Sequence, residues 1–517
     1  MPSSCRARRR PRNGCLAVAL ACLSLAGCAT DRLALAPASP ERAWEIPPSF
    51  DDLPPPGSRP AARNPSGATT APAAANPAPA TAENRTPRGN SVAIDRSRRY
   101  DLAGLIDLAQ RNNPETREAW EQARQAALAV GLVESTYVPQ IAAELVGGFQ
   151  HTPLPIPTTL VRKGYFTANT EELLPTLTAK WLLFDFGRRD RLVETAEANS
   201  FVANVAFTGA HEKLVYAVSR NYFAIGATRG RLHVAEQALK SAEIVQDAVT
   251  SKRAHELATV VELAQARRQT AQARYNLERA KGADSAAYAA LVASVGVAPD
   301  ASIQVADSTE TPLPAVPSGD VDQLVRDALG NRPDIIAALG KVRAAEATLS
   351  SAEAAFYPTV GLEAQAYQNV GGVSTEGSRY YTVNEPGANI LLKLSLPLFD
   401  GGARDAQISI AHSKVAAARH LLDQAQDAAV QQVTDAYDAL HTGLAEYEAA
   451  LALTKAAETA YDAALDAYRH GVGNYTDLAT AETALSQAQS AKEDAHANVF
   501  TAAAALAFST GTILSQP

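Results

Sequence analysis

The sequence has 517 residues and is 46% hydrophobic, yet only 6% of it is aromatic and it contains a single methionine. Most of the apolar content is therefore alanine and small aliphatic residues, which suit long, closely packed helices better than a bulky globular core. The formal net charge of −8 leaves no basic surface for nucleic acid, so we expect no nucleic-acid partner.

The N-terminus has the layout of a secretory signal peptide. Five arginines between positions 6 and 12 precede an apolar run from Cys15 to Leu25, which is too short to remain as a membrane-spanning anchor. The run continues into Leu25-Ala26-Gly27-Cys28, which resembles the lipobox of bacterial lipoproteins. That resemblance implies cleavage between Gly27 and Cys28 and a covalent lipid on Cys28.

The cysteines favour this interpretation over an ordinary signal peptide that happens to contain cysteine. All four lie within the first 28 residues, so cleavage before Cys28 leaves one thiol and no disulfide within a mature protomer. Ala29 follows that cysteine, and resemblance to enterobacterial lipoproteins implies export to the outer membrane where Asp is absent from this position. We therefore predict a lipoprotein signal peptide over residues 1–27 and contact with outer-membrane lipid.

Residues 28–95 comprise the lipidated Cys28 and a stretch rich in Pro, Ala, Asn and Ser that lacks apolar periodicity. Such a composition buries too little apolar surface to fold by itself, so it predicts a disordered or extended linker. After the signal peptide no run of about 18 apolar residues occurs, and we expect no membrane-spanning helix.

The remainder of the chain is an internal repeat. Pro114 lies in the segment LIDLAQRNNPE, which recurs 219 positions later as LVRDALGNRPD around Pro333. Past the first helical segments the offset becomes 215, as from Asp185 to Asp400, and it then stays constant for almost ninety residues. A constant length is what a continuous helical rod requires, whereas the four extra residues before Phe184 indicate a loop. We predict two repeats, at 96–310 and 311–517, each with the order helix, β-hairpin, long helix and short helix.

Within the variable region of each repeat the apolar residues alternate with polar ones. Residues 176–183, 359–366 and 389–396 each have one apolar and one polar face. Segments of about nine to eleven such residues are typical of transmembrane barrel strands, although a soluble sheet would alternate too. One chain offers four strands, which cannot close, so about 12 strands from three chains are the smallest arrangement that leaves a pore.

A helical pattern follows each Phe-Asp pair and runs to about Arg253 and Arg469. Apolar residues recur at intervals of seven, as in Val433, Leu440 and Tyr447, which predicts a left-handed supercoil in rods of roughly 100 Å. Glycines at 471 and 473 predict the turn that reverses the second rod into a shorter helix from Asp477 to about Phe508. The corresponding turn at 253–259 has no glycine, so the two hairpin tips should differ.

These motifs together resemble the TolC family of outer-membrane efflux proteins, in particular its lipoprotein (NodT-like) branch, over about Asp101 to Gly511. The resemblance is carried by the duplication and by the segments NRPDI at 331–335, LFDGG at 398–402 and YRHG at 468–471 followed by Asp477-Leu478. It implies an α+β membrane protein in which a long antiparallel coiled-coil α-barrel continues into β-barrel strands, four per protomer and 12 in a trimer. It also implies an equatorial domain built from segments near the termini and between the repeats.

The implied function is that of a trimeric outer-membrane channel, the passive exit duct of a tripartite efflux system for small molecules or drugs. The implied partners are a periplasmic adaptor (membrane fusion) protein and an inner-membrane pump, with the helical body in the periplasm. Two alternatives stay open, namely the exit duct of a type I protein-secretion system and a purely structural coiled-coil lipoprotein.

In the family an acidic ring closes the periplasmic entrance, just after the glycine-containing turn. The matching position is Asp477, with Glu262 as its repeat partner, while the family's second acidic position is here Thr480. An acidic ring would favour cations, but a carboxylate at a helix N-terminus is also explained by capping alone. Arg253, Gly471 and Gly473 are the candidate tip residues for contact with the adaptor.

We expect no catalytic residue, no metal and no cofactor other than the lipid on Cys28. His255 and His470 occupy equivalent positions, yet neither has a second ligand three or four residues away. The sequence contains no nucleophile elbow, P-loop or dinucleotide-binding motif, so it does not indicate an enzyme. Tyr222 and Tyr437 are expected to fill grooves between helices.

Overall fold

The computed structural model describes residues 31–46, 98–160, 162–298, 301–307, 312–314, 320–375 and 378–515. The predicted signal peptide, Cys28 and most of the predicted linker lie outside the described residues. The elements of the first half are η1 (Asp31–Leu35), β1 (Arg99–Tyr100), α2 (Leu102–Asn112), α3 (Pro114–Glu134), η3 (Ser135–Tyr137), β2 (Gln140–Pro155), β3 (Tyr165–Phe184), α4 (Arg188–Ala254) and α5 (Val260–Val295). Those of the second half are β4 (Gln304–Val305), α6 (Val321–Asn331), α7 (Pro333–Ala354), β5 (Thr359–Thr375), β6 (Tyr381–Ser395), α8 (Ala403–Arg469) and α9 (Tyr475–Ser509).

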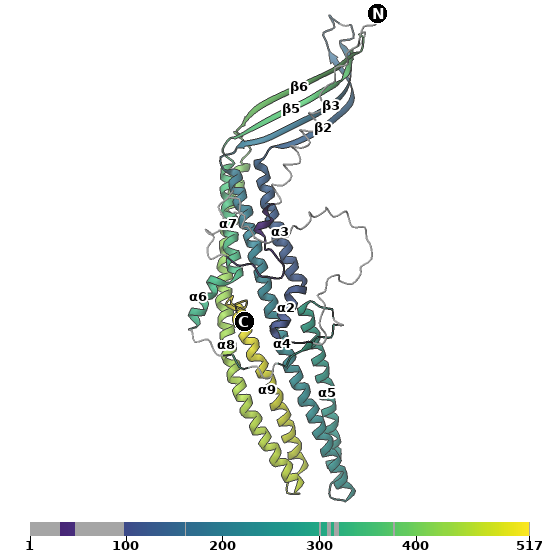
Figure 1. Cartoon of the computed structure of the whole chain (residues 1–517), viewed down its shortest axis with the longest axis vertical. Helices are drawn as coiled ribbons and strands as arrows, with labels where there is room; N and C mark the ends of the chain where they lie inside the picture. The colour runs from purple at the N-terminus through teal and green to yellow at the C-terminus, as the bar shows by residue number, and fades with distance from the viewer. Residues whose placement is uncertain are drawn as a thin grey trace, which may run out of the picture.

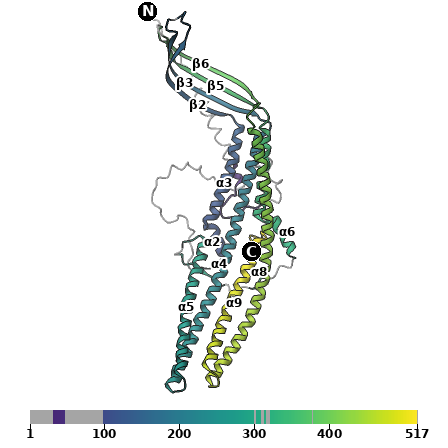
Figure 2. The same ribbon diagram turned by 180° about the vertical axis from the view of Figure 1, so that it is seen from behind.

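The molecule is a long rod of helices with a sheet at one end and two helical hairpins at the other (Figure 1). Helices α4 and α8 have 67 residues each, which at 1.5 Å per residue corresponds to rods of about 100 Å. Next to the sheet α3, α4, α7 and α8 pack in that order, and towards the tips α5 and α9 return along α4 and α8. The view from behind shows the same side-by-side arrangement (Figure 2). No helix among the described residues is both long enough and apolar enough to cross a membrane.

The four long strands form one antiparallel sheet in the order β2-β3-β5-β6. The two hairpins of the repeat therefore pair side by side through β3 and β5. The strands have 16, 20, 17 and 15 residues, so the expected length of nine to eleven residues is wrong. Glu171-Glu172 and Pro175 interrupt the alternation within β3, yet β2 pairs with all three residues and β5 pairs with both glutamates. Backbone hydrogen bonds between strands do not require alternating side chains, so the alternation in the sequence underestimated the length of the strands.

Midway along the rod lies a compact region built around a short parallel pair of strands, β1 and β4, with α2 beside α4. Its core includes Leu105, Ile225 and Leu291, each at most 1% exposed. Tyr222 belongs to the same core, which confirms that it fills space between helices. Helix α6 packs separately against α8, where Tyr437 is partly buried against a second apolar cluster.

The repeated Asn-x-Pro motif marks a break between two helices at which a return helix ends. Pro114 opens α3 at a position where its missing N–H costs nothing, and the Asn113 side chain accepts a hydrogen bond from the Glu115 N–H. Gly296, which ends α5 in the left-handed conformation, lies directly against the Asn113 backbone. In the second repeat Gly511 occupies the equivalent place against Asn331 and Arg332.

Residues 31–46 fall within the segment predicted to be a disordered or extended linker, and they are instead held against α3 and α4. Arg32 pairs with Glu134 at the end of α3, and Trp44 packs edge-on against Phe201 of α4 at 5.6 Å. Backbone carbonyls of this segment accept three side-chain hydrogen bonds from the two helices. These specific contacts order a segment whose composition alone does not predict order.

Candidate functional site

The register of the sheet separates two faces of opposite polarity, because cross-strand partners share a face. One face is mainly aliphatic and includes Ile141, Ala143, Leu145, Leu173, Leu177, Trp181, Leu362, Ala364, Ile390 and Leu392. The other face is mainly polar and includes Gln140, Glu144, Thr176, Thr178, Lys180, Glu363, Gln365, Asn389 and Lys393. Leu145 and Ile390 leave 67% and 74% of their surface exposed in the single chain. An apolar face of this size must be covered by something other than water.

Aromatic side chains are exposed at both ends of this sheet. Tyr165, Tyr380 and Tyr381 lie at the end remote from the helices. Trp181, Phe184, Phe186 and Tyr357 lie at the end next to the helices, where Phe186 and Tyr357 stack at 5.3 Å. Two aromatic belts that flank an apolar band are the pattern of outer-membrane barrel strands.

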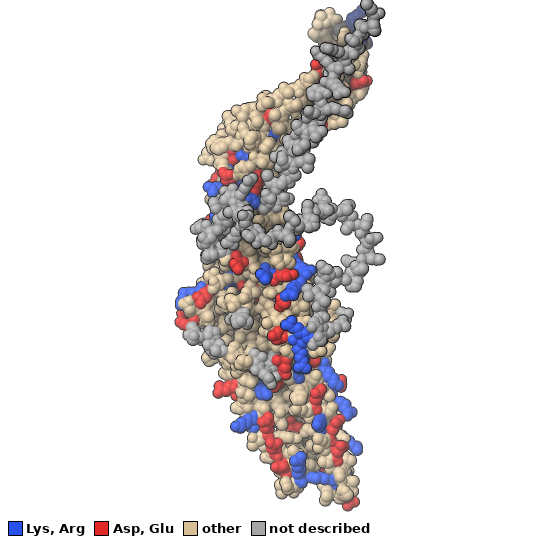
Figure 3. Space-filling view, viewed as in Figure 1, with Lys and Arg blue, Asp and Glu red and all other residues tan. Residues whose placement is uncertain are grey.

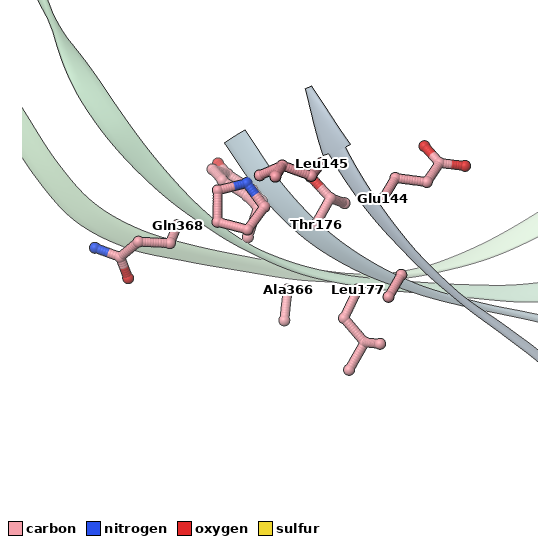
Figure 4. A pocket seen from close by; sticks show the side chains of 9 residues that line it. Glu144, Leu145, Thr176, Leu177, Ala366 and Gln368 are labelled. Carbon is pink, nitrogen blue, oxygen red and sulfur yellow. The ribbon is translucent and has the colours of Figure 1, made fainter. Parts of the chain in front are cut away.

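An open hollow of about 550 Å³ lies on the sheet across β2, β3 and β5 (Figure 4). In the close view Leu177 and Ala366 point to one side of the ribbon, whereas Glu144 points to the other. The hollow is therefore bounded by residues of both faces and is a depression in a sheet, not an enclosed ligand pocket. The charged side chains are denser over the helices than over the sheet (Figure 3).

A buried ion pair joins the sheet to α4. The Arg189 Nε donates to Asp185 at 3.1 Å, and both side chains are only 8% exposed. The Arg189 Nη1 donates to the carbonyls of Thr136 and Leu182, at 3.0 and 2.8 Å, and the guanidinium lies 4.6 Å from the centre of the Tyr137 ring. One cation thus connects η3, which follows α3, with the end of β3 and the start of α4.

The second repeat has an equivalent ion pair that is less buried. Arg404 donates to Asp400 at 2.7 Å and lies 4.6 Å from the Phe356 ring, but the Asp400 side chain is 28% exposed. The repeated Leu-Phe-Asp segment is therefore the joint between strands and rods.

The structure places Asp477 and Glu262 at equivalent positions, in the first turns of α9 and α5 at the hairpin tips. Asp477 is exposed, its N–H donates to the Asn474 side chain, and one carboxylate oxygen accepts from Asn474 Nδ2 at 2.7 Å. Glu262 forms a capping box with Thr259, whose N–H and hydroxyl both donate to the same carboxylate oxygen. The Glu262 carboxylate therefore takes part in capping, whereas the Asp477 carboxylate only contacts the amide of the capping residue Asn474.

The tip residues Arg253, Gly471 and Gly473 lie in the last turn of α4 and in the α8–α9 turn. Gly471 has φ of +73°, and its equivalent in the first tip is Glu256, with φ of +63°. A residue other than glycine is strained in this left-handed backbone conformation. The first tip therefore forms with Glu256 the same turn that the second tip forms with Gly471. Behind the tips the two hairpins are held together by an apolar cluster and by the Lys252 ammonium, which donates to the Tyr468 carbonyl at 3.1 Å.

Comparison with known proteins identifies the chain. The model of the family described as outer membrane efflux protein matches residues 105–297 and 324–512, which is most of the chain and coincides with the two repeats. The chain belongs to the outer membrane efflux protein family. Among curated relatives, CyaE of Bordetella pertussis is 28% identical over 74% of this chain and 78% of its own length. The cation efflux system protein CusC of Escherichia coli K12 is 26% identical over 74% of this chain and 80% of its own length.

A solved membrane protein from Pseudomonas aeruginosa, 26% identical, matches with a TM-score of 0.66 over 79% of this chain and 93% of its own. The resemblance to the TolC family and the predicted fold class are confirmed. The protein is thus an outer-membrane efflux channel with a helical body in the periplasm. The described residues contain no group of three or more His, Cys, Asp or Glu that could hold a metal ion.

Buried titratable groups lie along α4 of the channel, and the sequence patterns did not indicate them. Glu212 is only 5% exposed, and its burial raises its pKa to about 7; the nearby Asp334 adds to the shift and Arg332 opposes it. Burial likewise raises the pKa of Glu197 to about 7 and lowers the pKa of His211. Burial disfavours the ionised carboxylate, so these two carboxyls are mainly protonated only below about pH 7.

The two carboxyls should therefore make the channel more stable in mild acid than in mild alkali, whereas His211, whose pKa is lowered, acts in the opposite direction. The stability from a group whose pKa is raised on folding is fully present below its unfolded pKa and is lost as the pH rises through its folded pKa. For Glu212 that window runs from about pH 4.5 to about pH 7, and the full shift corresponds to a loss of about 3 kcal/mol. Thermal unfolding of the detergent-solubilised channel at pH 5 and pH 8 measures this difference.

Glu212→Gln should reduce the pH dependence, because the amide resembles the protonated carboxyl. Glu236→Gln, at an exposed position of the same helix, is the matched control. An unchanged pH dependence in Glu212→Gln would rule out this carboxyl as its source.

Proposed function

We propose that the channel is the passive exit duct of a tripartite efflux system, assembled as a homotrimer and anchored by a lipid on Cys28. The observation that carries this proposal is the open four-stranded sheet. Within the described part of the chain β2 and β6 each have a strand on one side only. Unpaired strand edges are not tolerated in lipid, so other copies of the chain must pair with them, and three copies supply about 12 strands.

The helical layer supports the same assembly. It is open at α3 and α8, which continue the two open edges of the sheet. Both helices expose large apolar side chains, namely Leu128 and Leu132 on α3 and Leu421 and Val430 on α8. Contact of α3 with α8 of the next protomer would cover these residues while β2 pairs with β6. The apolar face of the sheet would then face lipid and the polar face the lumen.

Reconstitution tests the duct. Purified protein should migrate as a heat-sensitive trimer and conduct ions across planar bilayers. A structural coiled-coil lipoprotein would form rods without conductance, and that result would overturn the proposal. The two-faced sheet argues against this alternative, because such a lipoprotein has no use for it.

The lipid anchor gives an all-or-none prediction. Cys28→Ser should abolish incorporation of labelled palmitate and block cleavage after Gly27, because the thiol is the only acyl acceptor at that position. Gel mobility and mass spectrometry of the N-terminal peptide measure both effects. Cys22→Ser, inside the predicted signal peptide, should change neither. Palmitate in the Cys28→Ser protein would place the anchor elsewhere.

For the gate we propose Asp477, with Glu262 as a weaker contributor, because the capping box already engages the Glu262 carboxylate. Three exposed copies of Asp477 near the channel axis would concentrate cations at the periplasmic entrance. Asp477→Asn leaves the Asn474 cap in place and should lower cation preference roughly severalfold, as expected for about 1 kcal/mol per lost charge.

Reversal potentials in asymmetric KCl measure this change. Glu262→Gln, made at the equivalent position of the first repeat, should have a smaller effect. Equal and unchanged selectivity in both variants would contradict the assignment of the gate.

We further propose that the tips carrying Arg253, Gly471 and Gly473 contact the periplasmic adaptor, which connects the duct to an inner-membrane pump. Leu257 and Val472 are 76% and 83% exposed at the two tips, so apolar surface is available there for a partner. Photo-crosslinkers at Arg253 and Val472 should capture the adaptor, and capture only from positions near the sheet would refute this contact.

A further inference from the structure

Residues 31–46, here called the strap, are the feature that the duct itself does not explain. At one end the Arg32 Nε donates to Glu134 at 2.6 Å, and its Nη2 pairs with the other oxygen of that carboxylate. This bidentate pair is mostly buried, with the two side chains 12% and 20% exposed, and Glu197 of α4 faces the same guanidinium. Glu134 is the last residue of α3, a few residues before β2 begins. The strap is thus clamped where the rod meets the sheet.

From this clamp the strap runs along the helices away from the sheet. The Asn204 amide donates to the Leu35 carbonyl at 2.7 Å, and the Trp120 Nε1 donates to the Pro37 carbonyl at 2.9 Å. Farther along, the Thr208 hydroxyl donates to the Trp44 carbonyl at 2.8 Å. Asn204 and Thr208 lie about 24 and 30 Å from the start of α4, at 1.5 Å per residue. Several of these bonds go to backbone carbonyls, so they hold the path of the chain itself.

The distance to the lipid is short. Cys28 precedes Arg32 by four residues, which span at most about 14 Å when fully extended. An acyl group on Cys28 must therefore enter a membrane within that distance of the rod–sheet junction of its own protomer. Before the trimer closes, each protomer has an exposed apolar sheet face and two open edges.

We infer that the strap is an assembly device, in which Arg32 and the α3–α4 groove hold the acylated N-terminus at the rod–sheet junction so that each unclosed sheet meets the bilayer surface in a fixed orientation. This inference rests on the proposed lipidation of Cys28. Orientation at the surface raises the chance that two open edges meet, in the way that tethering raises effective concentration. The strap acts through the lipid, so its effect on assembly depends on the lipid.

That dependence supplies the test. Trimer formation is followed by pulse-chase and unheated gel migration in four full-length proteins: wild type, Arg32→Gln, Cys28→Ser behind an ordinary cleavable leader, and the combination of both changes. With the lipid present, Arg32→Gln should slow trimer formation at least threefold. Without the lipid, assembly is slow and Arg32→Gln should add nothing. Arg42→Gln, which removes the same charge from an exposed position of the strap, is the matched control and should assemble as wild type.

If the strap merely stabilises the rod, Arg32→Gln should slow assembly equally with and without the lipid, and that result would overturn the inference. The absence of any effect of Arg32→Gln in either background would also overturn it. Trp120→Phe removes the indole donor to Pro37 and keeps an aromatic ring at this position, so it should show the same lipid-dependent slowing in smaller degree. Palmitate labelling of the wild type distinguishes failure of the proposed lipid anchor from failure of the role assigned to the strap. If wild type takes up no palmitate, the proposed anchor fails and the inference fails with it; if palmitate is present but the lipid dependence is missing, only the strap assignment fails.

Discussion

Replacing Arg189 with methionine should destabilise the channel by about 3–5 kcal/mol, because the change leaves the Asp185 carboxylate buried without its cationic partner. It also removes the donors to the Thr136 and Leu182 carbonyls and the cation over the Tyr137 ring. The rod and the sheet would lose their common joint in the first repeat. We expect a severe loss of heat-stable trimer and a lower midpoint of urea unfolding.

Two variants make this prediction specific. The double variant Asp185→Asn with Arg189→Met should recover part of the loss, because no charge is left buried. Arg404→Met, at the equivalent position of the second repeat, should cost less, because Asp400 is exposed to water. Equal losses in Arg189→Met and Arg404→Met would contradict the role of burial in this joint.

Gly296→Ala should destabilise the channel by about 2–4 kcal/mol. Gly296 has φ of +77°, and an added Cβ would lie 2.8 Å from the Asn113 Cα, a backbone atom that cannot move aside as a flexible side chain could. The end of α5 would then separate from the break between α2 and α3. Thermal unfolding followed by circular dichroism measures the loss.

Gly282 provides the control within the same helix. A Cβ there meets nothing within 4 Å, and glycine in a helix interior costs about 0.5–1 kcal/mol relative to alanine. Gly282→Ala should therefore stabilise the channel while Gly296→Ala destabilises it. A stabilising Gly296→Ala would show that the left-handed cap and its contact with Asn113 carry no strain.

Much of the architecture follows from patterns that are local in the sequence. The rods were expected to end near Arg253 and Arg469, and α4 and α8 end at Ala254 and Arg469. The return helix expected from Asp477 to Phe508 spans Tyr475–Ser509. Heptad spacing and turn residues are local properties of a helix, so they are readable without knowing what the helix packs against.

The contacts that hold these elements together were not predictable in the same way. The equivalence of Asp185 and Arg189 with Asp400 and Arg404 was visible in the duplication, and it was the one signal that could have indicated the joint. Nothing in the sequence pairs Gly296 with Asn113, Arg32 with Glu134, or Glu212 with Asp334, because each pair is distant along the chain. Burial depends on what lies opposite, and so the raised pKa of Glu212 became visible only in the fold.

The sequence by itself therefore determined the duplication, the rods, the two-faced strands and the candidate lipid site, since each is written in periodicity or in a short motif. Tertiary structure decided the order of the strands, the joints between sheet and rods, the place where each return helix packs and the path of the strap. These features depend on packing and on hydrogen bonds between residues that are distant in the sequence. Such contacts form, and stabilise the protein, only when the chain folds.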